Sequence, residues 1–134
     1  MKKRVVITGM GAVTPLGVTT EQFWQGLISG YSGIGRITRF DPSKFSSQIA
    51  GEVKDFDPEK YLEKREIRKT DRFVHFAVAS ARMALEQAKL DLNQVDPSRI
   101  GVIYGSGIGG LETHSQQEKI AMEKGPRRVS PFFI

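Results

Sequence analysis

The stretch RVVITGMGAVTPLG, residues 4–17, decides the fold class of this 134-residue chain. Its first half is a run of β-branched residues that predicts a buried strand over residues 4–8. The strand leads directly into Gly9 and Gly11, which lack a Cβ and so permit a tight turn. The helical pattern at residues 20–28 follows this turn, and a strand, a turn and a helix in this order are typical of an α/β layered protein.

Further helices and strands are predicted along the rest of the chain. A long helix is predicted over residues 70–90, with Thr70 as its N-cap and Asp71 in its first turn. A second buried strand is expected at residues 99–104, and another helix at residues 111–124. Residues 36–60 look irregular, apart from a short edge strand within residues 49–53. The order predicts an α/β protein with a parallel component.

The long helix carries a stripe of residues at spacings of three and four. The residues of the stripe are Phe73, Phe76, Ala77, Ser80, Ala81, Ala84 and Ala88. Its small residues, the alanines and the serine, would allow another backbone to approach the helix closely.

Composition excludes several classes of protein. No apolar run approaches the roughly 18 residues of a membrane span, and the basic start is followed by too short an apolar block for a secretory signal. We therefore expect a cytoplasmic protein that does not bind membranes. The chain has no cysteine, so it supplies no disulfide, thiolate metal site or cysteine nucleophile. His75 is expected to be either a packing residue or a surface residue, His114 is expected to be exposed, and no metal site is predicted.

The positive charge is clustered. The chain has 20 Lys and Arg against 15 Asp and Glu, a net charge of +5. Residues 64–72 carry five basic and two acidic side chains, and residues 124–128 carry three further basic ones. A helix would place Arg65, Arg68, Lys69 and Arg72 on one face. A solvated face is one interpretation. Docking to an acidic protein is the other, and it fits better than nucleic acid because no aromatic residues alternate with the cations.

The two glycine-rich turns fail the common nucleotide motifs. After Gly11, the third glycine of a dinucleotide fingerprint is missing, and no acidic residue ends a following strand. In GSGIGG, residues 105–110, Leu111 stands where a phosphate-binding loop needs lysine. Tyr104 stands where a hydrolase elbow around Ser106 needs glycine. Two interpretations stay open: a plain backbone turn, or a turn that projects Ile108 into a cavity.

Four segments together resemble the amino-terminal third of the β-ketoacyl-acyl carrier protein synthase II family. They are RVVITGMGAVTPLG, the SGI of residues 32–34, RIGVIYGSGIGG at residues 99–110 and GPRRVSPFFI at residues 125–134. The resemblance implies a thiolase-like α/β fold in α-β-α-β-α layers, working as a homodimer. Residues 1–134 would be the amino-terminal portion of that domain, an incomplete first half that is poorly stable alone.

The resemblance also implies an activity. The family elongates fatty acyl chains by decarboxylative Claisen condensation of an acyl-enzyme with malonyl-acyl carrier protein, without a metal or organic cofactor. Its cysteine nucleophile, two histidines and lysine come later in the chain, so no catalytic residue is expected here and the segment alone should be inactive. The alternative is a non-catalytic partner subunit that resembles a chain-length factor and lacks the cysteine.

Two sets of site residues follow from the resemblance. Ile108, Phe133 and Ile134 match acyl-pocket positions, the last two near the dimer interface. The expected partner is acyl carrier protein, loaded with acyl or malonyl groups. Its docking positions match Arg65, Arg68, Lys69, Arg127 and Arg128.

Overall fold

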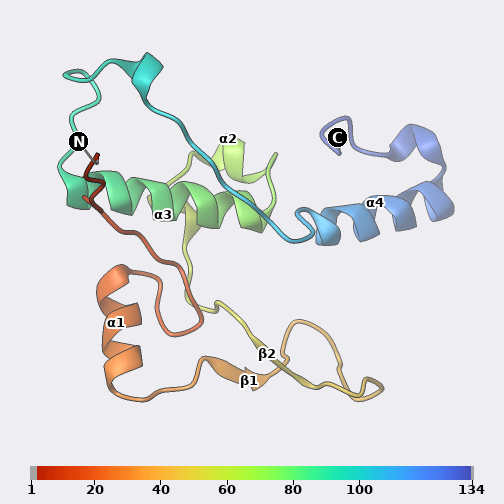
Figure 1. The fold of residues 1–134 in the computed structure, drawn as a ribbon. Helices are drawn as coiled ribbons and strands as arrows, with labels where there is room; N and C mark the ends of the chain where they lie inside the picture. Colours follow the sequence, from red (N-terminus) through yellow and green to blue (C-terminus); the bar gives the residue numbers. More distant parts are fainter. Residues whose placement is uncertain (1–2, 134) are drawn as a thin grey trace. The chain divides into compact units, whose positions relative to one another are not determined.

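The computed structural model describes residues 3–133 and contains, within them, four α-helices and a two-stranded sheet (Figure 1). The helices are α1 (Thr20–Ile28), α2 (Lys64–Ile67), α3 (Arg72–Ala88) and α4 (Leu111–Lys124). Strand β1 (Ile34–Arg36) pairs antiparallel with β2 (Ile49–Gly51), and Gly35 lies opposite Ala50. Short 3-10 turns occur at η1 (Pro58–Lys60), η2 (Pro97–Arg99) and η3 (Pro126–Arg128).

The described residues form two compact units. One contains the chain up to Asp57 together with Ala79–Val95, and the other contains Pro58–Val78 together with the chain from Asp96 onward. Helix α3 is continuous and contributes its two halves to different units.

In the first unit, the opening glycine turn packs against α3. A Cβ built at Gly9 would overlap the carbonyl oxygen of Ala84, and one at Gly11 would overlap that of Ser80. The Met10 amide between them donates to Oε1 of Gln87 at 2.7 Å. The close approach predicted from the small residues of α3 is therefore confirmed, and it explains why glycine is needed at both positions of the turn.

Two strand predictions are wrong for the described residues. Residues 4–8 and 99–104 run without a β-ladder, and the sheet that forms is antiparallel rather than parallel. Their apolar side chains lie open: Val5 is 91% exposed and Ile103 is 100% exposed. A strand exists only when a neighbouring backbone takes up its N–H and C=O groups, and the described residues offer these segments no such neighbour.

Smaller differences concern element boundaries. The edge strand expected within residues 49–53 is found as β2, but its partner β1 was not predicted. The long helix begins at Arg72 rather than near Thr70, and the residue after it, Lys89, has a positive φ of 50°. Asp71, not Thr70, takes the N-cap place, because its carbonyl accepts the amides of Val74 at 2.9 Å and His75 at 3.3 Å.

A carboxylate holds the chain beside the small sheet. Glu52 accepts the Thr38 amide at 3.0 Å, the Thr38 hydroxyl at 2.7 Å and the Arg39 amide at 3.2 Å. The hydroxyl hydrogen bond, and then the Thr38 amide, lower the pKa of Glu52 below its ordinary value. A group with a lowered pKa stabilises the fold above that ordinary value, and the contribution is lost as the pH falls through the folded-state pKa.

Two turn carboxylates behave in the same way. The backbone amide of Asn93 lowers the pKa of Asp91, and the Ser98 hydroxyl lowers that of Asp96.

Within residues 3–133, no helix has both the length and the apolar character to cross a membrane.

Substitution of Gly11 by alanine should destabilise the protein by about 1–3 kcal/mol, because the added Cβ meets backbone atoms of α3 that cannot turn away. Thermal unfolding of the whole protein measures the effect. Gly35→Ala is the matched control, since a Cβ there meets nothing within 4 Å. Equal unfolding temperatures for the two variants would contradict the close-approach argument.

Candidate functional site

Every described residue of the predicted site lies in the second unit. Arg65 belongs to the short helix α2, and Arg68 and Lys69 follow it directly; all three side chains are exposed. The Glu63 amide donates to the Glu66 carboxylate at 3.2 Å, which fixes the start of α2 as in a capping box. Lys64, beside the cluster, pairs with Glu59 at 3.4 Å between Nζ and Oε2.

The basic run does not form a single helix, so the condition under which all four cations would share one helical face is not met. The Thr70 hydroxyl donates to the carbonyl of Glu66 at 2.7 Å, and helix α2 ends at Ile67. Helix α3 then starts afresh at Arg72, whose guanidinium lies 5.0 Å from the centre of the Phe76 ring. The break between the helices separates Arg72 from the exposed cations before it.

The second basic pair lies on η3. Gly125, with a φ of 86°, ends α4, and Pro126 begins the 3-10 turn that carries Arg127 and Arg128. Both arginine side chains are exposed. The predicted helix stop at Gly125 is therefore confirmed, and the reason is a backbone conformation that residues with a side chain rarely adopt.

A contact joins the first basic group to the segment after η3. The ammonium group of Lys69 lies 4.7 Å from the centre of the Phe132 ring, within the range of a cation–π interaction. The same segment is tied to α4, because the Ser130 amide donates to Oε1 of Gln117 at 2.7 Å. The two basic groups that are separate in the sequence therefore belong to one part of the structure.

Ile108 projects from a tight glycine turn. The Gly109 amide donates to the Ser106 hydroxyl at 3.1 Å, and Gly109 has a φ of 72°. The turn leaves Ile108 75% exposed, so its side chain is presented outward. This exposure fits both interpretations of the turn, a plain backbone turn and one that projects Ile108 into a cavity. The cavity that it would enter stays a prediction.

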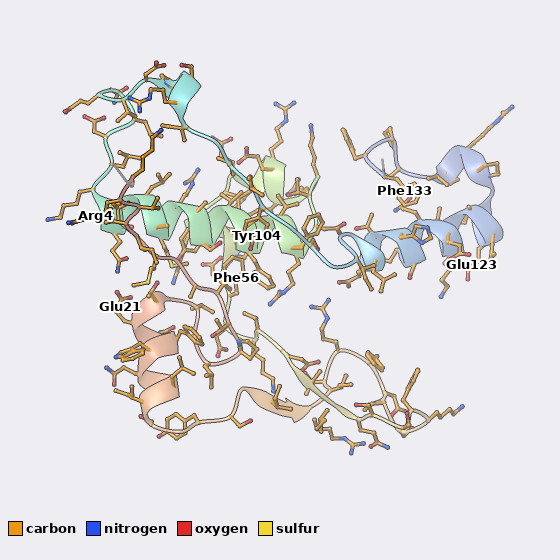
Figure 2. The ribbon with its side chains drawn as sticks, viewed as in Figure 1. Arg4, Glu21, Phe56, Tyr104, Glu123 and Phe133 are labelled. Atoms are coloured by element: carbon orange, nitrogen blue, oxygen red, sulfur yellow. The ribbon has the colours of Figure 1, made fainter. Side chains whose placement is uncertain are left out.

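The other two residues predicted for the pocket are Phe133 and Ile134. Phe133 is half-buried, and its ring centre is 5.7 Å from that of His114 on α4 (Figure 2). Ile134 lies outside the described residues. Of the predicted pocket residues, Phe133 and Ile108 are therefore both placed within the second unit.

The structure decides between the two roles left open for His75. His75 is only 8% exposed, and its Nε2 lies 3.1 Å from the Thr70 hydroxyl. Because that hydroxyl gives its proton to Glu66, Nε2 of His75 must be the donor to it. His114 is exposed. Among residues 3–133, no group of three potential ligands is placed to hold a metal ion.

One polar pair was missed by the sequence analysis. The Thr113 hydroxyl, in the first turn of α4, donates to the carboxylate of Asp71, 42 positions earlier. Asp71 was read only as a residue of the first helical turn. No short-range pattern connects the two residues, because their meeting depends on how α4 and the start of α3 pack.

Comparison with known proteins assigns the family. Residues 2–134 match the family described as "Beta-ketoacyl synthase, N-terminal domain". The chain belongs to this family of condensing enzymes.

Close relatives make the assignment more particular. The chain is 50% identical over 133 residues to "3-oxoacyl-[acyl-carrier-protein] synthase 2" of Synechocystis, an alignment that covers 99% of this chain and 32% of the relative. The chain thus spans about a third of the length of the curated relatives that it matches.

Solved structures agree on the fold. The ishigamide ketosynthase/chain length factor superimposes with a TM-score of 0.76 at 29% identity, over 96% of this chain and 32% of that one. A type II polyketide ketosynthase in complex with its acyl-carrier protein superimposes with a TM-score of 0.77 at 29% identity, over 98% of this chain and 34% of that one. The chain has the thiolase-like α/β fold of these ketosynthases and covers part of it.

Replacing Thr70 by valine should lower the unfolding free energy by about 1–3 kcal/mol. The variant leaves the buried ring donor of His75 and the carbonyl of Glu66 without their hydroxyl partner. Chemical denaturation of the whole protein measures the loss. Thr70→Ser keeps the hydroxyl and serves as the control. If valine and serine gave the same stability, the hydroxyl link would have no energetic role.

Proposed function

We propose that residues 1–134 are the amino-terminal portion of a thiolase-like domain in a 3-oxoacyl-acyl carrier protein synthase. The observation that carries this proposal is the 50% identity to the Synechocystis synthase, which runs through 99% of the chain. The reaction is elongation of a fatty acyl chain by two carbons. The complete protein would be a cytoplasmic homodimeric acyltransferase.

The chemistry has two stages. A cysteine thiolate first takes the acyl group from its carrier, releasing the carrier thiol. Malonyl carrier protein then loses carbon dioxide, and the resulting carbanion attacks the carbonyl carbon of the acyl thioester. The bond from that carbon to the cysteine sulfur breaks, which frees the thiolate and leaves the 3-oxoacyl product on the carrier protein. This chain has no cysteine, so the nucleophile must come from another part of the protein and this segment alone would be inactive.

The contribution of this chain would be recognition. Arg65, Arg68 and Lys69 present exposed cations, of which Lys69 lies beside Phe132, and η3 adds two further arginines. An acidic carrier protein would be attracted and oriented by such a surface. The neighbour solved as a ketosynthase complex with its acyl-carrier protein supports this partner by analogy.

The second contribution would be selection of the acyl chain. Ile108 stands out from a turn whose shape is set by Gly109, and Phe133 lies in the same unit. Large apolar side chains at a pocket wall limit the length of chain that fits. We assign Ile108, Phe133 and Ile134 to that wall.

A second candidate is a non-catalytic partner subunit. The observation that favours it is the similarity to a structure described as a ketosynthase/chain length factor. Such a subunit would keep the fold and the interface but would lack the nucleophile. A cysteine-directed alkylating probe applied to the whole protein separates the two candidates, since only the synthase should be labelled and inactivated.

The activity itself is tested with the purified whole protein, acyl-acyl carrier protein and malonyl-acyl carrier protein. The expected result is a 3-oxoacyl product two carbons longer, with release of one carbon dioxide per turnover. Absence of product from a folded protein that contains the cysteine would overturn the proposed function.

Reversal of Arg68 and Lys69 to glutamate should reduce kcat/KM for the carrier-bound substrate by about 10-fold or more at low salt, since both cations face solvent at the proposed docking surface. The loss should shrink as salt screens the interaction. Steady-state kinetics at two ionic strengths measure it. Lys44→Glu with Lys89→Glu makes the same change in net charge elsewhere, and an equal loss in that control would argue against local docking.

Ile108→Phe should shorten the acyl chains that the enzyme accepts, because the larger ring fills space at the pocket wall. We expect the rate with short acyl carriers to be kept and that with long ones to fall by about 10-fold or more. The measurement is kcat/KM across a series of chain lengths. A chain-length profile identical to that of the natural protein would remove Ile108 from the pocket.

A further inference from the structure

Asp71 stands at the amino-terminal ends of two helices. Its carbonyl accepts the first amide hydrogen bonds of α3, and its carboxylate accepts the hydroxyl of Thr113 in the first turn of α4. The side chain is half-buried. A negative charge at this place is favourable for both helices, because the helix dipole makes their amino-terminal ends positive.

The same carboxylate lies against the glycine turn. A Cβ built at Gly110 would overlap Oδ2 of Asp71, so the carboxylate lies directly against the backbone of that residue. Gly110 is the residue just before α4, and its carbonyl accepts the His114 amide at 2.9 Å. Asp71 therefore touches both the residue that ends the turn and the helix turn that follows it.

The other side of the turn also rests on α3. A Cβ at Gly109 would come within 3.8 Å of the Phe73 ring, and the Gly109 amide is bound by the Ser106 hydroxyl. Two residues from the start of α3, Asp71 and Phe73, thus lie against the two glycines that follow Ile108. These contacts therefore flank the part of the turn that directly follows Ile108.

We propose that Asp71 and Thr113 are positioning residues that hold the Ile108 turn in place and so sharpen the acyl-chain preference of the enzyme. The proposal rests on the proposed function, since it takes Ile108 to be part of the pocket wall. Neither residue touches the substrate. Without their hydrogen bond, a long acyl chain would displace the turn more easily. The pocket wall would then discriminate less between acyl chains of different length.

The test uses the whole protein and the variants Thr113→Val and Thr113→Ser. Valine has the shape of threonine without its hydroxyl, while serine keeps the hydroxyl. Amide hydrogen exchange over residues 105–111 measures how firmly the turn is kept in its conformation. We expect exchange to quicken at least about 10-fold in the valine variant, because a hydrogen bond to a charged group is lost. The serine variant should exchange like the natural protein.

The dependence of kcat/KM on acyl-chain length tests whether Thr113 influences the chain preference. The ratio of kcat/KM between the preferred and the longest acyl carrier should fall at least about threefold in Thr113→Val, a change that a general loss of stability would not produce. Combination with Ile108→Ala should add no further flattening, because Thr113 acts through Ile108. Gly110→Ala, which displaces the Asp71 carboxylate, should reproduce the valine phenotype and serves if Thr113→Val fails to fold.

The outcomes separate the two proposals. If Ile108→Phe alters the profile but Thr113→Val and Gly110→Ala leave both exchange and profile unchanged, the positioning role is overturned and the proposed function stands. Faster exchange with an unchanged profile also overturns it. If the whole protein makes no 3-oxoacyl product, or if Ile108→Phe changes nothing, the failure lies in the proposed function, and the positioning role falls with it.

Discussion

The closeness with which other backbone segments approach α3 is the constraint on which the rest of the structure depends. At its carboxyl-terminal half, the carbonyls of Ser80 and Ala84 leave no room for a side chain at Gly11 and Gly9. The small residues of the helix, with Ala79 at 0% exposure, permit this contact. Because backbone lies against backbone, neither partner can adjust by rotating a side chain, and the positions of the opening turn and the helix are fixed together.

The start of α3 is approached in a comparable way by the glycine turn at residues 105–110. Phe73 and Asp71 lie against Gly109 and Gly110, so the turn that presents Ile108 is supported by the helix start. The basic residues before α3 are held by a different device, the hydroxyl of Thr70 on the Glu66 carbonyl. The start of α3 therefore supports the turn that carries Ile108, whereas the basic residues before the helix are held by a local hydrogen bond.

Much of this was predictable from local patterns, and what was not predictable depends on distant partners. The helices, the stop at Gly125 and the need for small residues on α3 follow from spacing and backbone freedom. The antiparallel pairing of β1 was missed because three residues with a central glycine carry no alternation. The contact between Asp71 and Thr113 could not be predicted, because the local sequence around each residue gives no sign of the other. The strands expected at residues 4–8 and 99–104 have the right composition, but pairing is a property of two segments rather than one.

Those two unpaired segments have a consequence for biosynthesis. Val5, Ile7, Val102 and Ile103 are more than half exposed in the described structure, and β-branched runs of this kind readily pair with foreign chains. If this chain is the first third of a synthase, it leaves the ribosome well before the remainder, at about 5–20 residues per second. During that interval the nascent protein exposes two β-branched segments that can pair with other chains. Its yield in the cell should then depend on chaperones that cover them until the rest of the sheet arrives.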